Sequence, residues 1–150
     1  MPTKTATPTL RPRLRSPSVL RRFRGVVVVI AGLWLVGVAV TIGNHAQRFI
    51  QRSEVVSGEV VKLDFGPAHG EVRFAPRQGG IVTYSQNGEV WLHPGQGVRV
   101  RYDPARPNEG PVVDQPGAIW GPTIIVAALG VIFMAVGAAL LRHAWRTRAR

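Results

Sequence analysis

Candidate catalytic and metal-binding residues are sparse in this sequence of 150 amino acids, and their spacing matches no established catalytic or metal-binding pattern. None of the four histidines has a second ligand at the i, i+4 spacing that a helical zinc site uses. The absence of cysteine excludes disulfides, thiolate metal sites and cysteine nucleophiles. We therefore expect no metal, no cofactor and no catalytic residue. The histidines are His45, His69, His93 and His143.

Serine nucleophiles and phosphate-binding loops are equally unsupported. Ser53, Ser57 and Ser85 lie in neither a G-x-S-x-G elbow nor an S-x-x-K pattern. Glycine is plentiful, but the sequence contains neither G-x-x-x-x-G-K-[ST] nor a strand-linked G-x-G-x-x-G. The sequence therefore predicts a protein that is not an enzyme.

The charged residues fall into three blocks separated by two long uncharged segments. The 19 Lys and Arg against 8 Asp and Glu give a formal net charge of +11, which in a soluble chain would suggest a nucleic-acid partner. No charged residue occurs in segments 25–47 and 115–141. A basic block beside a bilayer is explained by membrane topology and by anionic lipid, so we expect no nucleic-acid partner.

Both uncharged segments are long enough to cross a membrane as helices. Segment 25–43 would reach roughly 28 Å and segment 118–141 roughly 36 Å, against a hydrocarbon layer of about 30 Å. Buried strands rarely exceed about ten residues, which excludes a strand for either segment. We predict two transmembrane helices, 25–43 and 118–141.

Small and aromatic residues within these segments indicate how the helices pack. Glycine allows close helix approach, and we expect the faces around Gly32 and Gly130 to lie against each other. Trp120 and Trp145 bracket the second span near the depths that aromatic rings prefer. Trp34 lies in the middle of the first span, where we expect it to pack between helices.

A cleaved signal peptide is the main alternative for the first span. Its apolar run is longer than the usual 7–15 residues of an export signal, and a basic leader of 24 residues precedes it. The residues that follow the run form a poor small-x-small cleavage site. We expect an uncleaved anchor.

The distribution of charge predicts the orientation. The tails 1–24 and 142–150 carry the entire net positive charge, whereas segment 44–117 contains all eight acids and eight basic residues. The positive-inside rule then places both tails in the cytoplasm and segment 44–117 outside, in a bacterial inner membrane. The first tail is rich in Pro, Thr, Ser and Arg, so we expect it to be disordered.

Between the spans, segment 54–114 has the alternation and turn residues of a small β-domain. We expect an antiparallel barrel or sandwich of SH3-like or OB-like size, whose thin core gains stability from the membrane, the spans or another subunit. In the first predicted strand, Val61, Leu63 and Phe65 would share one face. Gly79-Gly80 and Asn87-Gly88 would form turns. The predicted strands are 60–65, 71–74, 81–84, 89–92 and 98–103.

One motif resembles a known family. The stretch Gly95–Pro107 reads G-x-x-V-x-V-x-Y-D-P-x-x-P and follows a glycine hairpin between two spans. This layout, over about residues 25–141, is similar to the bacterial membrane family called domain of unknown function 3592. An acidic residue is common in that family where this chain has Gly97. The resemblance implies an integral membrane protein with no assigned activity.

These observations favour a two-span membrane protein whose extracytoplasmic β-domain binds or scaffolds proteins. Its partners would be membrane lipid, a protein that adds a strand at an open sheet edge, or a second copy of the chain. One alternative is a membrane-bound enzyme with a site at the domain–membrane junction, using Asp103, His93 or Arg101, although Asp103 before Pro104 is typical of a turn. Another is a subunit of a pore or transporter, but the spans lack the ionisable groups expected at depth.

Overall fold

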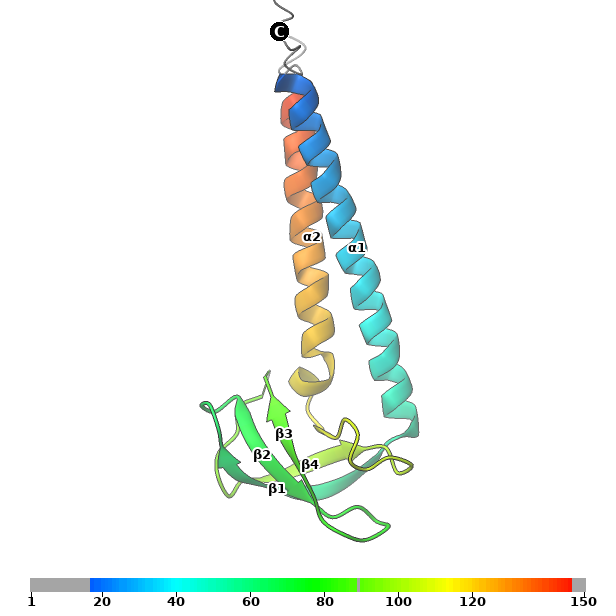
Figure 1. Cartoon of the computed structure of the whole chain (residues 1–150), viewed down its shortest axis with the longest axis vertical. Helices are drawn as coiled ribbons and strands as arrows, with labels where there is room; N and C mark the ends of the chain where they lie inside the picture. The colour runs from blue at the N-terminus through cyan, green and yellow to red at the C-terminus, as the bar shows by residue number, and fades with distance from the viewer. Residues whose placement is uncertain (1–16, 89, 147–150) are drawn as a thin grey trace, which may run out of the picture.

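The computed structural model describes residues 17–88 and 90–146, which form two long helices and one five-stranded sheet. Figure 1 shows the helices side by side, with the sheet at the end opposite to the start of α1 and the end of α2. In chain order the elements are α1 (Pro17–Arg52), β1 (Glu54–Leu63), β2 (His69–Phe74), β3 (Val82–Asn87), β4 (Gly97–Tyr102), β5 (Val112–Val113) and α2 (Pro116–Arg146).

Both helices extend beyond the predicted spans. They contain 36 and 31 residues, or roughly 54 and 46 Å at 1.5 Å per residue, and each is long and apolar enough to cross a membrane. Because α1 begins at Pro17, residues 17–24 are helical and not part of a disordered tail. Proline suits the first helical turn, where its missing N–H leaves no partner unsatisfied. The other tail residues, 1–16 and 147–150, lie outside the described residues.

Glycines bring α1 and α2 into contact, as their sequence predicts. A Cβ atom on Gly32 would lie 2.8 Å from the carbonyl oxygen of Gly130, and one on Gly137 would lie 3.0 Å from that of Gly25. Any larger residue at these points would force the helices apart. The contact recurs every seven residues on both helices, which is the spacing of a helix pair with a left-handed supercoil. We call this set the glycine seam: Gly25, Gly32, Gly130 and Gly137.

The sheet is antiparallel and curls into a half-barrel, in the order β3-β2-β1-β4-β5. The long strand β1 pairs with β4 along its first half and with β2 along its second half. Gly58 lies where the two pairings overlap, and a Cβ there would approach the carbonyl oxygen of Arg73 to 2.8 Å. Glycine at this position therefore permits the strand to bend. The predicted hairpin across Gly79-Gly80 is confirmed, with Phe74 opposite Val82.

The buried face of β1 differs from the sequence prediction. Val60 is fully buried, whereas Val61 is exposed and Phe65 lies in the following loop with most of its surface exposed. A β-bulge explains the difference, because the register with β2 shifts between Val60 and Lys62. The extra residue interrupts the strict alternation from which the prediction was made.

The predicted strand 89–92 is also wrong. Val90 and Leu92 are buried in the core, but residues 90–92 pair with no strand, and residue 89 lies outside the described residues. Gly88, at a φ of 69°, turns the chain away after β3, and the Leu92 N–H donates to the loop carbonyl of Pro67. The alternation therefore reflects two side chains that fill the end of the half-barrel. The fifth strand is instead the two-residue β5.

A buried glutamine joins the two edges of the sheet. Gln86 on edge strand β3 accepts a 2.9 Å hydrogen bond from the backbone N–H of Val113 on edge strand β5. This bond closes the side of the half-barrel beside α2, which begins three residues later, and Ala118 of α2 packs on the core. Val82 and Tyr84 of β3 are partly buried and pack against the core. The core itself contains residues from β1, β2, β4, β5 and the segment after β3: Val60, Val72, Phe74, Val90, Leu92, Val98, Val100, Tyr102 and Val113.

Candidate binding site on the β-domain

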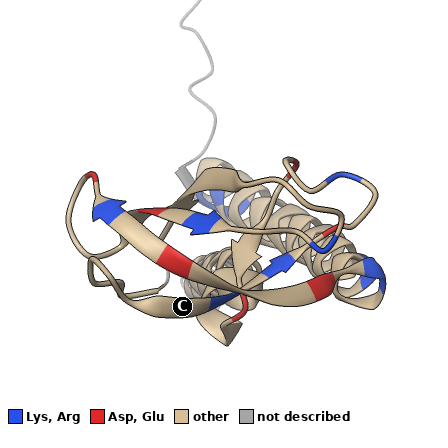
Figure 2. Cartoon of the chain, turned by 90° about the horizontal axis from the view of Figure 1, so that it is seen from below, with Lys and Arg blue, Asp and Glu red and all other residues tan. Residues whose placement is uncertain are grey.

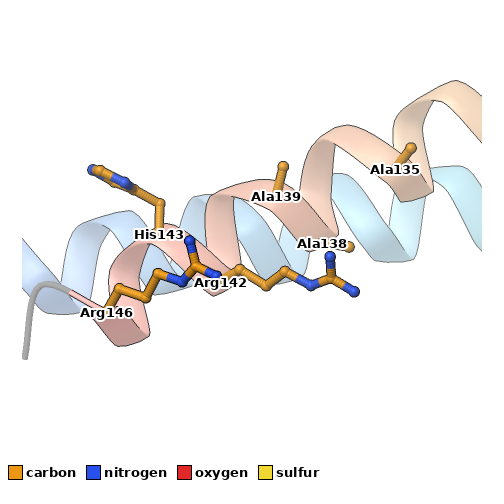
Figure 3. A pocket seen from close by; sticks show the side chains of 6 residues that line it. All are labelled: Ala135, Ala138, Ala139, Arg142, His143 and Arg146. Carbon is orange, nitrogen blue, oxygen red and sulfur yellow. The ribbon is translucent and has the colours of Figure 1, made fainter. Parts of the chain in front are cut away.

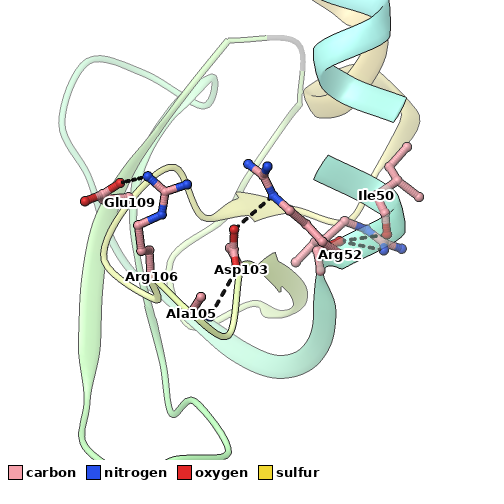
Figure 4. A network of polar contacts seen from close by, with 8 residues as sticks. Ile50, Arg52, Asp103, Ala105, Arg106 and Glu109 are labelled. Carbon is pink, nitrogen blue, oxygen red and sulfur yellow. Dashed lines mark hydrogen bonds and ion pairs between the residues drawn. The ribbon is translucent and has the colours of Figure 1, made fainter. Parts of the chain in front are cut away.

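The motif that ends β4 forms the joint between helix and sheet. Asp103 is nearly buried; one of its carboxylate oxygens accepts a hydrogen bond from the N–H of Ala105 at 3.0 Å, and the other lies 2.9 Å from Nε of Arg52 at the end of α1 (Figure 4). Arg101 contacts Asp114 at 2.8 Å and the hydroxyl of Ser53 at 3.2 Å. Asp103 is thus a turn former, as the sequence predicts, and also an anchor for α1.

The structure does not bring together Asp103, His93 and Arg101, the three residues of the enzyme hypothesis. Arg101 and Asp103 lie at the end of β4 beside Arg52. His93 lies before the opposite end of β4, in a turn that bonds back to Val60. The backbone N–H of His93 donates to the side chain of Gln96. A general base and an acid at opposite ends of one strand cannot act on the same atom.

The three serines that were considered as nucleophiles lie at a helix end or within the sheet. Ser53 donates to the carbonyl of Ile50 and so caps the end of α1. Ser57 and Ser85 lie opposite Arg99 and Glu71 in the sheet ladder. Within residues 17–88 and 90–146, no group of three or more His, Asp or Glu side chains could hold a metal ion.

The histidines are spread over the whole molecule. His69 faces the Asn87 side chain at 3.4 Å, at the end of the β2–β3 ladder. His45 lies on the last third of α1 and His143 near the end of α2. His69 and His93 lie at the same end of the β-domain, but His93 is exposed and neither is one of a group that could hold a metal. Their positions give no reason to assign them chemistry.

Trp34 does not pack against α2. Its side chain is 68% exposed on the outer face of α1, beside Gly37 and Thr41. Within one chain, Trp34 therefore does not take the helix-packing position that its place in the span predicts. The glycine seam occupies the inner face of α1, and the tryptophan is displaced to the face that remains open.

A hollow of about 510 Å³ runs along one face of α2 near its end. Figure 3 shows three alanines followed by cationic side chains, with Arg142 extending beside Ala138. The residues around it are Ala135, Ala138, Ala139, Arg142, His143 and Arg146. This lining contains neither a carboxylate nor a hydroxyl, so it offers no nucleophile paired with a base.

A second hollow, of about 320 Å³, lies on the sheet beside the β2–β3 hairpin. We call it the hairpin pocket; it is lined by Ser57, Gly58, Glu59, Arg73, Phe74, Ala75 and Ile81. Ile81 is 74% exposed at its rim, and Glu59 and Arg73 face each other across β1 and β2. Arginine is enriched at protein–protein contacts, and here Arg73 lies in one hollow with the exposed Ile81, which makes the hollow a candidate protein contact.

The hairpin that carries this pocket is held in place by the rest of the domain. The Arg77 N–H donates to the hydroxyl of Tyr102 at 3.0 Å, and the Gln78 amide donates to the carbonyl of Pro104 at 3.2 Å. Arg77 also pairs with Glu54 at 3.4 Å. A partner would meet a preformed surface, which reduces the entropy lost on binding. Sequence analysis did not single out Ile81, because it placed this residue at the start of a predicted strand, 81–84.

The outer surface of the β-domain carries both signs of charge. Figure 2 shows Lys and Arg interspersed with Asp and Glu along the strands. Lys62 lies 3.0 Å from Glu71 and 3.2 Å from Asp64, and its hydrogen bond to Glu71, then that to Asp64, raises the pKa of the lysine. A balanced surface of this kind suits a protein partner better than a polyanion such as nucleic acid.

Comparison with known proteins gives one relative. Immune protein Tsi4 of Pseudomonas aeruginosa is 31% identical to this chain over 107 residues, which cover 71% of the chain and 72% of Tsi4. No family model matches the sequence, so the resemblance to domain of unknown function 3592 stays a prediction. No solved structure matches the chain either. The extent and identity of the match show that this chain belongs to the same family as Immune protein Tsi4.

Proposed function

We propose that this chain is an immunity protein that is embedded in the bacterial inner membrane and binds a protein toxin through its β-domain. The observation that carries the proposal is the kinship with Immune protein Tsi4 over more than two thirds of both chains. The hairpin pocket supplies a surface suited to a protein partner. We infer that the protein acts by binding and not by catalysis.

Membrane insertion is supported by the surface of the helix pair. A core helix of a soluble protein is mostly covered by other elements, whereas α1 and α2 contact mainly each other and leave large apolar side chains exposed along most of their length. Trp34, Ile124 and Phe133 are among these side chains. Hydrocarbon chains of a bilayer would cover them without any further protein.

The charges at the helix ends support the proposed orientation. Arg21, Arg22 and Arg24 lie at the start of α1, beside Arg142 and Arg146 at the end of α2. The other end of the pair carries the β-domain, whose segment of the sequence has no net charge. The positive-inside rule favours both helix termini in the cytoplasm and the β-domain outside, where it could meet an incoming toxin.

The proposed contact is the hairpin pocket and not an added strand at β5. Edge strand β5 has only two residues, and the N–H of Val113 is already bonded to Gln86. A partner strand would find few free backbone groups there. The β2–β3 hairpin lies at the end of the molecule away from the helices in Figure 1, where a soluble protein has free access.

The test is competition between sibling cells. A strain that lacks this gene should lose viability when grown on a surface in contact with its parent, and expression of the wild-type chain should restore it. Ile81→Asp should fail to restore viability although the protein accumulates, because a charge would be buried in the contact. Val61→Asp, a matched change at an exposed valine outside the pocket, should restore it fully.

Equal survival of the deletion strain and its parent would contradict the immunity role. Full protection by Ile81→Asp would leave immunity intact but remove the hairpin pocket from the toxin contact.

A further inference from the structure

Two aromatic side chains of the β-domain are almost fully exposed. Phe65, in the loop after β1, is 86% exposed, and Trp91, in the segment after β3, is 76% exposed. Neither belongs to the hairpin pocket. An exposed apolar patch is typical of a surface that meets a partner or a membrane.

Backbone hydrogen bonds place the segments that carry them side by side. The N–H of Leu92 donates to the carbonyl of Pro67 at 2.7 Å, and the N–H of Gly88 donates to the carbonyl of Ala68 at 2.8 Å. Phe65 lies two residues before the first of these acceptors, and Trp91 immediately precedes Leu92. The two exposed aromatics therefore belong to one end of the domain.

This end of the domain is the one beside α2. Gln86, two residues before Gly88, is bonded to Val113, and α2 begins at Pro116. In Figure 1 the loop after β1 and the segment after β3 both reach toward the helices, near the level of the first turns of α2. Trp120 lies in those turns, as expected for a residue at a membrane–water interface.

We propose that Phe65 and Trp91 form an aromatic anchor that enters the interfacial layer of the bilayer beside α2. The inference rests on the membrane insertion proposed above. Aromatic rings favour this layer, and the covalent link to α2 keeps the loops within reach of it at all times. A soluble partner would have to enter between the domain and the lipid. The anchor would fix the tilt of the domain and leave the hairpin pocket facing away from the membrane.

The chain has no cysteine, which makes depth measurements simple. Single variants Phe65→Cys and Trp91→Cys, labelled with an environment-sensitive fluorophore, are reconstituted in vesicles of phosphatidylethanolamine and phosphatidylglycerol. Nitroxide lipids that carry the quencher either near the headgroup or at the bilayer centre report the depth of each label. Trp34→Cys is the control within the proposed span, and Ile81→Cys is the control on the far side of the domain.

Labels at residues 65 and 91 should shift their emission to the blue and lose more intensity with the shallow quencher than with the deep one. The label at residue 34 should show the reverse order, and the label at residue 81 should lose little with either. Because both aromatics are exposed, the two substitutions should leave the fold intact. As a check without substitutions, amides of segments 64–69 and 88–92 should exchange more slowly in vesicles than in detergent.

The outcomes separate the two proposals. Quenching at residue 34 without quenching at residues 65 and 91 overturns the aromatic anchor and leaves the spans in place. No quenching at residue 34 overturns membrane insertion and the anchor together. Quenching at residue 81 equal to that at residues 65 and 91 shows a domain that lies on the membrane without this orientation, and it overturns the anchor. Crosslinking of residues 65 and 91 to a protein shows a protein interface and also overturns the anchor.

Discussion

The carboxylate of Asp103 makes two structural contacts at once. It closes the turn after β4 through the N–H of Ala105, and it holds the end of α1 through Arg52. Because the side chain is nearly buried, its removal leaves a backbone donor without its acceptor as well as a guanidinium without its counter-ion. The motif thus connects the β-domain to the helix that precedes it by 51 residues in sequence.

Asp103→Ala should lower the free energy of unfolding of the β-domain by about 1–3 kcal/mol. Asp103→Asn should cost less, because the amide oxygen still accepts from Ala105 while the ion pair is lost. Arg106→Ala breaks the nearby exposed pair with Glu109 and should cost no more than about 1 kcal/mol. Denaturant unfolding of the purified protein measures all three, and equal losses for Asp103→Ala and Arg106→Ala would contradict the anchor role.

The buried hydroxyl of Tyr84 lowers the stability of the core. The hydroxyl is buried and has no hydrogen-bond partner among the described residues, while the ring packs edge-on against Phe74 at 6.0 Å. Burial raises the pKa of this phenol because the ionised form would lose its hydration. The folded domain therefore keeps Tyr84 protonated.

The raised pKa of Tyr84 predicts how the stability of the domain changes with pH. Since the pKa is higher in the folded than in the unfolded chain, stability is unaffected below about pH 10 and falls above it, where only the unfolded chain ionises this residue. Tyr84→Phe should remove that alkaline loss and should not destabilise the domain at pH 7, with a gain of up to about 1 kcal/mol. Thermal unfolding at pH 7 and pH 10.5 tests this, and a large loss at pH 7 would reveal a partner for the hydroxyl.

At the scale of elements, the pairing of α1 with α2 depends on the absence of side chains at the seam. Gly32→Leu should separate the helices and lower the midpoint of thermal unfolding in detergent, because the new side chain meets the Gly130 carbonyl and the backbone of Met134. Gly37→Leu is the matched control, since a Cβ on Gly37 meets nothing within 4 Å. If the two variants melt alike, the seam does not hold the helices together.

In β1, a single β-bulge changes which side chains face the core. The bulge between Val60 and Lys62 lets β1 bury Val60 and still present Lys62 to Glu71 on the outer surface. In the same way, Val90 and Leu92 reach the core from a segment that makes no ladder. At residues 60–65 the alternation therefore predicted a strand but not its buried face, whereas at residues 90–92 two alternating side chains are buried without a strand.

At the scale of the whole molecule, the uneven charge makes a prediction about sidedness. Cysteine placed at exposed Asn108 in the β-domain should react with a membrane-impermeant maleimide in intact spheroplasts, and cysteine at exposed Arg24 should react only after permeabilisation. The native chain, without cysteine, gives the blank for both. The opposite labelling pattern would place the β-domain in the cytoplasm and exclude an encounter with toxin outside the cell.

Features that depend on neighbouring residues could be predicted from the sequence. Two uncharged apolar segments were sufficient to predict the helices 25–43 and 118–141 within longer helical elements, because helix length and hydropathy are local properties. The hairpin at Gly79-Gly80 and the turn at Asp103 were predicted from the conformations that these residues favour.

Most contacts between distant segments depend on the folded chain and could not be predicted from the sequence. The link from Gln86 to Val113 and the anchor of Arg52 on Asp103 each join residues 27 or more positions apart. The same applies to Trp34, which stays on the open face because α2 packs on the other one. Whether an apolar side chain is buried or left exposed for a partner depends on what the rest of the chain brings next to it, and local sequence patterns do not contain that information.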